Sequence, residues 1–232
     1  MKIGIMQPYF FPYIGYFQLI NAVDKYVIYD DVNYIKNGWI NRNNILLNNQ
    51  KHLITLPLDA ASPFKLINEI DIIQNDKVKE KLLKTIQQAY RKAPYYEEVF
   101  PIIKNCIMGE YPLIAEALYH SFLSISQYLG IKTEFILSSK IEKDNELKAQ
   151  EKVIHICKLL NGTEYFNAIG GQELYSKLDF QNENIKLNFL KTKAIQYNQF
   201  NNEFMPNLSI IDVMMFNSPE KVKEMLGAYE LL

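Results

Sequence analysis

Residues 2–29, KIGIMQPYFFPYIGYFQLINAVDKYVIY, decide the fold class of this chain. The stretch opens with an apolar run at 2–6 that predicts a short buried strand. A loop follows at 7–12, because two prolines fix the torsion φ and lack an amide donor. Apolar spacing then predicts a helix over about 13–22, and residues 25–29 are rich in β-forming side chains. Strand, loop, helix and strand within about thirty residues predict a parallel α/β sheet with a right-handed crossover.

The rest of the chain extends this pattern. Residues 30–44 look like a polar loop, and 45–57 predict a hairpin around an Asn-Asn turn. Helical periodicity dominates about 75–130, and strands and helices alternate again after it. We therefore predict one α/β domain over 1–232, a Rossmann-like three-layer fold with a helical insertion or sub-lobe at about 75–130.

The composition is that of a globular chain with a large core. Of the 232 residues, 48% are hydrophobic and 22% are charged. The 25 basic and 26 acidic side chains nearly cancel, so no global field favours nucleic acid or an anionic membrane as a partner. No apolar run reaches the roughly 18–20 residues of a membrane span, and the N-terminus lacks a signal-peptide pattern. We expect a cytoplasmic protein without membrane insertion.

Cysteine and histidine placement argues against two kinds of site. Cys106 and Cys157 lie in separate helical patterns, which predicts buried reduced thiols and no disulfide. The three histidines lack the spacing of metal ligands, so we predict no metal site. The chain also lacks a P-loop, the dinucleotide-binding glycine fingerprint and a Gly-x-Ser-x-Gly motif, which argues against several common enzyme classes.

The first loop is a candidate binding site, because open parallel sheets bind ligands beyond the carboxyl ends of their strands. Gly15 would let a ligand approach the backbone, where free N–H groups at a helix start attract phosphate or carboxylate. Tyr9, Tyr13 and Tyr16 offer hydroxyls and stacking faces for a base or sugar. The predicted binding residues are Gln7, Pro8, Tyr9, Pro12, Gly15 and Tyr16. In the alternative, the prolines and aromatics only pack the loop under the sheet.

A second candidate site follows the strand at 25–29. Asp30 and Asp31 close this strand, a common place for a general base, so we predict that they are catalytic. Arg42 can grip carboxylate or phosphate, and Trp39, the only tryptophan, can stack on a sugar or base. The predicted binding residues here are Lys36, Trp39, Asn41, Arg42 and Asn43. In the alternative, Asp30 caps, Arg42 pairs with Asp31 and Trp39 fills the core.

Three later stretches are weaker candidates. Gly170 and Gly171 stand at a strand-to-helix junction where close backbone approach is useful, and we predict that they bind substrate. Residues 138–140, Ser-Ser-Lys, either bind phosphate or form an ordinary turn. In the helical tail at about 209–228, Ser209 is predicted to be an N-cap with Asp212 at the third helical position.

Five stretches together resemble the WbqC-like family. They are MQPYFFPYIGYFQLI at 6–20, DKYVIYDDVNYIKNGWINRN at 24–43, SSK at 138–140, GG at 170–171 and FMPNLSIIDVMMFN at 204–217. Genes of this family are typically found in bacterial clusters for O-antigen and other surface polysaccharides. The resemblance implies a transferase that passes an acyl or aminoacyl group to a nucleotide-linked or lipid-linked amino sugar. ATP or a pre-activated donor would supply the group, and we allow for a homodimer.

The first loop is also similar to the HIGH motif of nucleotidylyltransferases. Residues 13–16, Tyr-Ile-Gly-Tyr, stand where that superfamily has His-x-Gly-His. The two missing histidines argue against phosphoryl chemistry on a fold of that type. ATP-dependent nucleotidyl or adenylyl transfer, or amide ligation, is nevertheless one alternative function. The other is a non-catalytic protein that binds a nucleotide sugar.

Overall fold

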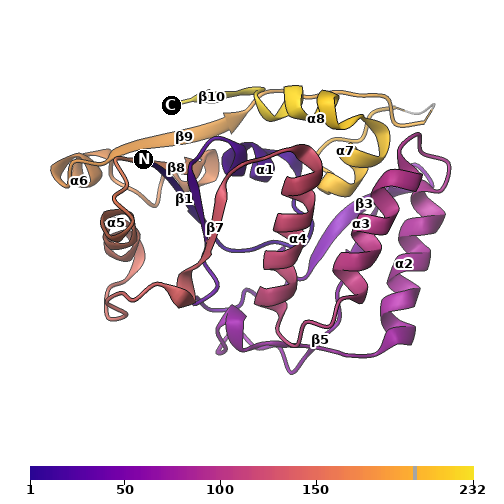
Figure 1. Ribbon diagram of the computed structural model, residues 1–232, viewed down its shortest axis with the longest axis horizontal. Coiled ribbons are helices and arrows are strands. Elements are labelled where there is room, and N and C mark those ends of the chain that lie inside the picture. Colours follow the sequence, from indigo (N-terminus) through magenta and orange to yellow (C-terminus); the bar gives the residue numbers. More distant parts are fainter. Residues whose placement is uncertain (201–202) are drawn as a thin grey trace.

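The computed structural model describes residues 1–200 and 203–232, which fold around one six-stranded sheet (Figure 1). Across the sheet the order is β10 (Tyr229–Leu231), β9 (Lys186–Thr192), β8 (Glu164–Ala168), β1 (Lys2–Met6), β2 (Lys25–Ile28) and β7 (Glu134–Leu137). In this sheet β1, β2, β7, β8 and β9 are parallel, and β10 joins the edge antiparallel to β9. This is the order of a doubly wound sheet, with its switch point between β1 and β8. The Rossmann-like α/β fold is confirmed.

Helices cover both faces of the sheet. One face carries α1 (Ile14–Asn21), α4 (Ile114–Leu129) and α8 (Pro219–Leu226), and the other carries α5 (Ala149–Leu159) and α6 (Lys177–Asn182). The strands alternate between the layers, as period-two side chains must. On β2, for example, Tyr26 and Ile28 join the core with α1 and α4, while Val27 joins the core with α5 and α6.

A long segment between β2 and β7 builds the right-hand part of Figure 1. It contains a hairpin, a second strand pair with a short 3-10 helix, and two helices, of which the second packs on α4 and the first packs on the second. These elements are β3 (Arg42–Leu47), β4 (Gln50–Thr55), β5 (Leu58–Asp59), η1 (Ile67–Glu69), β6 (Asp71–Ile72), α2 (Asp76–Tyr90) and α3 (Tyr96–Met108).

The local structure confirms one prediction and corrects two others. The Asn-Asn turn of the hairpin is confirmed, since Asn48 and Asn49 both have positive φ, 50° and 61°. The polar loop predicted for 30–44 is wrong at its end, because residues 42–44 pair with β4. The predicted helical tail is two helices, α7 (Ile210–Phe216) and α8. Ser218 caps the second, and Pro219, which cannot continue an interior helix, opens it.

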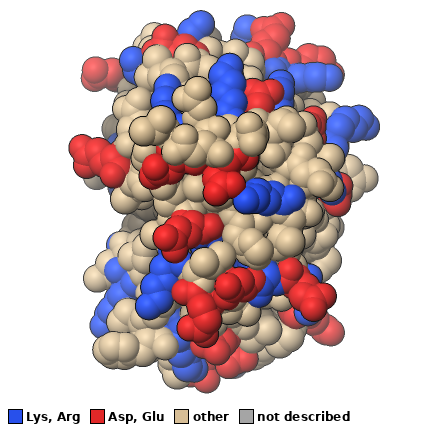
Figure 2. All heavy atoms as spheres, turned by 90° about the vertical axis from the view of Figure 1, so that its left-hand side faces the viewer, with Lys and Arg blue, Asp and Glu red and all other residues tan. Residues whose placement is uncertain are grey.

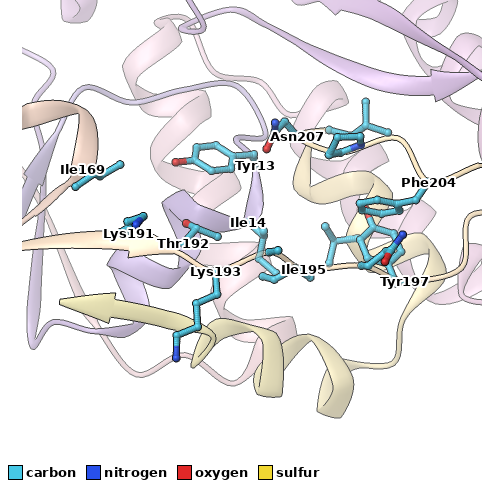
Figure 3. A pocket seen from close by; sticks show the side chains of 15 residues that line it. Tyr13, Ile14, Ile169, Lys191, Thr192, Lys193, Ile195, Tyr197, Phe204 and Asn207 are labelled. Atoms are coloured by element: carbon cyan, nitrogen blue, oxygen red, sulfur yellow. The ribbon is translucent and has the colours of Figure 1, made fainter. Parts of the chain in front are cut away.

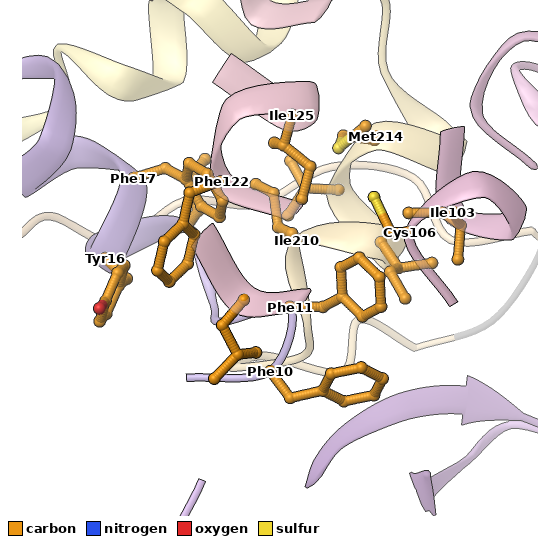
Figure 4. Close-up of a cluster of buried hydrophobic side chains, with 14 of the residues drawn as sticks. Phe10, Phe11, Tyr16, Phe17, Ile103, Cys106, Phe122, Ile125, Ile210 and Met214 are labelled. Atoms are coloured by element: carbon orange, nitrogen blue, oxygen red, sulfur yellow. The ribbon is translucent and has the colours of Figure 1, made fainter. Parts of the chain in front are cut away.

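The larger core includes the aromatic side chains of the first loop (Figure 4). Phe10 and Phe11 are buried, and Phe122 of α4 stacks on Tyr16 with ring centroids 5.4 Å apart. Cys106 and Cys157 are buried free thiols. Among the described residues, no helix is both long and apolar enough to cross a membrane.

Candidate functional site

Two adjoining cavities open at the carboxyl end of the sheet, and Tyr13 and Asn207 line both of them. The first has a volume of about 410 Å³ and lies between the start of α1 and the end of β9 (Figure 3). Its lining includes Ile169, Lys191, Thr192, Lys193, Tyr197 and Phe204. The second, of about 460 Å³, is lined by Tyr9, Pro12, Tyr13, Trp39, Asn43 and Asn207. We call the two cavities together the aromatic cleft.

Three distant stretches of sequence meet at the floor of this cleft, the loop 10–12. Asn43 of β3 donates its amide hydrogens to the carbonyl oxygens of Phe10 and Phe11, at 3.0 Å each. From the far end of the chain, the Ser209 hydroxyl donates to the same Phe11 oxygen at 2.6 Å, and the Ile210 amide donates to Pro12 at 2.8 Å. These contacts hold Phe11 at a φ of 41°, an uncommon conformation for a bulky residue.

Gly15 makes room for a side chain of the protein itself. A Cβ at this position would lie 2.4 Å from the Tyr13 ring and 2.5 Å from Oγ1 of Thr192. The ring of Tyr13 therefore folds back over the first turn of α1, between that turn and the cleft. The structure does not show the open backbone approach that the sequence suggested for Gly15.

Trp39 and Tyr13 are the most exposed aromatic rings of the cleft, at 44% and 36%. The backbone of Trp39 is fixed, since its carbonyl accepts the Phe10 amide at 2.9 Å. Tyr9 is half-buried, with its ring centroid 5.6 Å from that of Tyr16. Fixed main chain with partly exposed rings is the arrangement that a stacking site requires.

Several other predicted binding residues are engaged within the protein. Tyr16 is buried in the core and donates its hydroxyl to the carbonyl of Gln7 at 2.7 Å. Asn41 joins the Tyr34 hydroxyl to the Leu56 carbonyl, at 2.9 Å each. Pro8 is buried, and Lys36 is exposed outside the cleft lining.

Arg42 binds the loop that precedes it in sequence. Its guanidinium donates to the carbonyl of Gly38 at 2.9 Å and to oxygens of Asn37, and it does not pair with Asp31. At the other glycine pair, a Cβ on Gly171 would meet Oδ1 of Asn167 at 2.8 Å, whereas one on Gly170 would meet nothing within 4 Å. Neither glycine lines the cleft, although the preceding Ile169 does.

The two predicted catalytic acids form a separate cluster, which we call the acid edge: Asp30, Asp31, Ser139, Lys143 and Lys152. Asp30 is 1% exposed, and its two carboxylate oxygens accept the Ser139 amide at 2.9 Å and the Ser139 hydroxyl at 2.6 Å. The Ser-Ser-Lys stretch, η2 (Ser138–Lys140), is thus bound to an acid of the protein, which leaves those donors unavailable to a phosphate.

Asp31 is ion-paired. Its Oδ2 lies 2.7 Å from Nζ of Lys143 and 3.7 Å from Nζ of Lys152, while its buried Oδ1 has no hydrogen-bond partner among the described residues. Burial alone would raise the pKa of Asp31, but the hydrogen bond and charge of Lys143, with the charge of Lys152, hold it below its ordinary value. Neither Asp30 nor Asp31 is among the residues that line the cleft.

A third acid supports the wall of the first cavity. Asp212 is fully buried in α7 and accepts hydrogen bonds from Tyr90, Tyr197 and Gln199, at 2.6 to 2.7 Å. Burial raises the pKa of Asp212, although these three donors oppose the shift. The predicted cap at Ser209 is present, since its side chain accepts the Ile211 amide. Through Tyr197, Asp212 positions a ring that faces the cleft.

Sequence reasoning missed Thr192, Lys191, Lys193 and Asn207 as cleft residues. The only signal was for Asn207, which stands inside the FMPNLSIIDVMMFN stretch. In the part of the chain that the structure describes, no group of three or more His, Cys, Asp or Glu side chains is placed to hold a metal ion.

Comparison with known proteins gives a family and no activity. The model of the WbqC-like protein family matches residues 7–224. The chain is 28% identical over 219 residues to the "Uncharacterized protein Rv1507c" of Mycobacterium tuberculosis (strain ATCC 25618 / H37Rv), covering 93% of each chain. No solved structure matches. Since the family model spans nearly the whole chain, including all three stretches that meet at the loop 10–12, this protein belongs to the WbqC-like protein family.

Proposed function

We propose that this protein binds a nucleotide-linked or lipid-linked amino sugar in the aromatic cleft and transfers an acyl or aminoacyl group to it, in the assembly of a surface polysaccharide. The observation that carries the proposal is the second cavity. Two partly exposed rings, Trp39 and Tyr13, and the half-buried Tyr9 surround it, with the exposed amide of Asn207 beside them; the Asn43 amide is held by Phe10, Phe11 and Asn44. A pyranose has an apolar C–H face that packs on such rings and hydroxyls that pair with amides.

The first cavity suits the phosphate part of the same substrate. Lys191 and Lys193 are among its lining residues, although the Lys193 side chain extends away from Tyr13 (Figure 3), and Thr192 between them offers a hydroxyl. Lys191 is paired with Glu230 at 2.9 Å in an exposed ion pair, the kind that contributes little and exchanges readily for another anion. Because Tyr13 and Asn207 line both cavities, a sugar in one and its phosphates in the other would form one continuous ligand.

The transfer step needs a base. The sugar amine forms a bond to the acyl carbonyl carbon, the donor's leaving group departs with its electron pair, and the amine loses a proton. Of the two acids predicted for this role, Asp30 has both oxygens occupied by Ser139. We therefore assign the proton to Asp31, because its lowered pKa keeps it ionised at neutral pH.

A specific observation favours one other function, a non-catalytic sugar-binding protein. Neither acid lines the cleft, so binding in the cleft does not by itself bring a base to the amine. The ATP-dependent alternative has no comparable support. Where a HIGH motif would place its histidines, Tyr13 covers Gly15 and Tyr16 is buried in the core.

Mass spectrometry tests the proposal. Purified protein is incubated with nucleotide-linked amino sugars and with acyl or aminoacyl donors, and the sugar is examined for the added mass. We expect the product with wild type and none with Asp31→Asn, which should still bind the sugar. Binding without product for every donor would favour the non-catalytic function. No binding of any nucleotide-linked or lipid-linked amino sugar would contradict the proposal itself.

A further inference from the structure

Two neighbouring loops next to the cleft present apolar side chains to solvent. Phe64 is 92% exposed and Ile35 is 48% exposed, and Pro63 is exposed as well. Asn33 bridges to Leu66, the Tyr34 amide donates to the Lys65 carbonyl at 2.9 Å, and the Asn33 side chain donates to the Pro63 carbonyl at 2.8 Å. Residues 33–35 and 63–66 therefore run side by side. We call Ile35, Pro63 and Phe64 the apolar tip.

The base of the apolar tip is well fixed. Tyr34 is buried, and its hydroxyl donates to Asn41, which donates in turn to the backbone of Leu56. Gly38 donates to the carbonyl of Ile35 at 3.0 Å, and Arg42 closes the same turn. The second loop follows β5, at the lower edge of Figure 1. A nearly fully exposed phenylalanine on so constrained a base is not explained by packing within the chain.

Lysines flank the apolar tip on both of its loops. Lys36 and Lys65 stand directly beside Ile35 and Phe64, and sequence positions 32–58 and 60–68 contain no Asp or Glu. Glu69 follows, and its carboxylate accepts the Leu66 amide at 2.8 Å. Neither lysine forms an ion pair within residues 1–200 and 203–232 as described. Apolar side chains that enter a bilayer surface, flanked by lysines that attract anionic headgroups, are the basis of peripheral membrane binding.

A second exposed apolar pair lacks this charge pattern. Leu174 and Leu178 are 69% and 64% exposed, but Glu173 stands directly beside Leu174, and Leu178 lies between Lys177 and Asp179. They belong to the segment around α6, on the side that faces the viewer in Figure 2, where acidic and basic side chains are interspersed. Exposure alone therefore does not distinguish the apolar tip, but exposure combined with a lysine, and no acid, directly beside each of Ile35 and Phe64 in sequence does.

We infer that the apolar tip docks this protein on the surface of an anionic lipid bilayer. The same loop continues into Trp39, so docking would place the second cavity of the aromatic cleft near the membrane surface. This inference rests on the proposed function. Of the nucleotide-linked and the lipid-linked amino sugar, it selects the lipid-linked one, whose headgroup lies at the membrane surface. Docking is peripheral and requires no spanning helix.

Vesicle sedimentation tests the inference. Wild-type protein is mixed with vesicles of phosphatidylcholine containing about one-quarter phosphatidylglycerol, and with vesicles of phosphatidylcholine alone. We expect sedimentation with the anionic vesicles that weakens at high salt. Phe64→Ser should reduce the bound fraction about tenfold. Leu174→Ser, a matched change at the exposed pair near α6, should leave it unchanged. Neither side chain is buried, so both variants should fold.

The opposite results are equally clear. Wild type that stays in the supernatant with anionic vesicles would overturn the inference, as would equal sedimentation of Phe64→Ser and Leu174→Ser. A parallel titration of the soluble sugar headgroup, without vesicles, keeps the proposed function separate. Phe64→Ser should bind the headgroup as wild type does, because Phe64 does not line the cleft. If the protein binds the headgroup but not the vesicles, the membrane docking is refuted and the proposed function is not.

Discussion

The aromatic cleft and the acid edge both lie beyond the carboxyl ends of the sheet strands, yet their side chains have opposite surroundings. At the acid edge, Asp30 is buried and each of its carboxylate oxygens accepts a hydrogen bond from Ser139, and Asp31 is ion-paired with two lysines. In the cleft, Trp39 and Tyr13 keep more than a third of their surface open. Polar groups that are satisfied inside the protein stabilise it, whereas side chains left half-exposed on fixed backbone are free to bind.

The largest expected effect is the loss of stability when the buried Asp30 is removed. Asp30→Ala leaves the Ser139 amide and hydroxyl without their acceptor in a buried place, so it should lower the free energy of unfolding by about 3 kcal/mol. Asp59→Ala, at an exposed position on β5, is the control and should change stability by less than about 0.5 kcal/mol. Urea unfolding of the three proteins measures this. Equal stability of both variants would mean that Asp30 is not a structural residue.

The second effect belongs to the cleft. Gly15→Ala forces a Cβ against the Tyr13 ring and Thr192, so Tyr13 must move and the boundary between the two cavities is lost. We expect a loss of about 1–3 kcal/mol in stability, together with weaker sugar binding. Gly170→Ala provides the matched control, because its Cβ would meet no atom within 4 Å. Wild-type binding by Gly15→Ala would show that the position of Tyr13 does not matter for the ligand.

The smallest effect is a dependence on pH. Because the pKa of Asp31 is lowered in the folded state, its contribution to stability is fully present above the ordinary value of 3.8 and is lost as pH falls through the folded pKa. As pH falls below 3.8, wild type should therefore lose more stability than Asp31→Asn does. Unfolding curves at several pH values measure the difference. Parallel losses in the two proteins would show that the lysine pairs do not hold Asp31 ionised.

The sheet was predictable because its signals are local. An apolar run, a proline loop and a helical spacing lie within residues 2–29, and an Asn-Asn turn marks the hairpin at 48–49. The roles of the site residues depend on partners far along the chain. Ser139 stands 109 positions after Asp30, and Asn207 enters the cleft from the last part of the sequence. Nothing near Asp30 indicates that Ser139 will bind its carboxylate. Of the two side chains that fill the space at Gly15, Tyr13 is two residues away, but Thr192 comes from the far end of the chain.

The central claim, that the aromatic cleft is the ligand site, is tested most directly by the fluorescence of Trp39, the only tryptophan. Nucleotide-linked amino sugars are titrated into wild type and into Leu53→Ala. Leu53 is the control because it is as exposed as Trp39, at 44%, and lies outside the cleft. Calorimetry repeats the titration with Trp39→Ala. We expect a saturable change in Trp39 emission in the first two proteins, and binding about tenfold weaker in Trp39→Ala. Binding that leaves Trp39 emission unchanged, or that survives Trp39→Ala at full affinity, would contradict the claim.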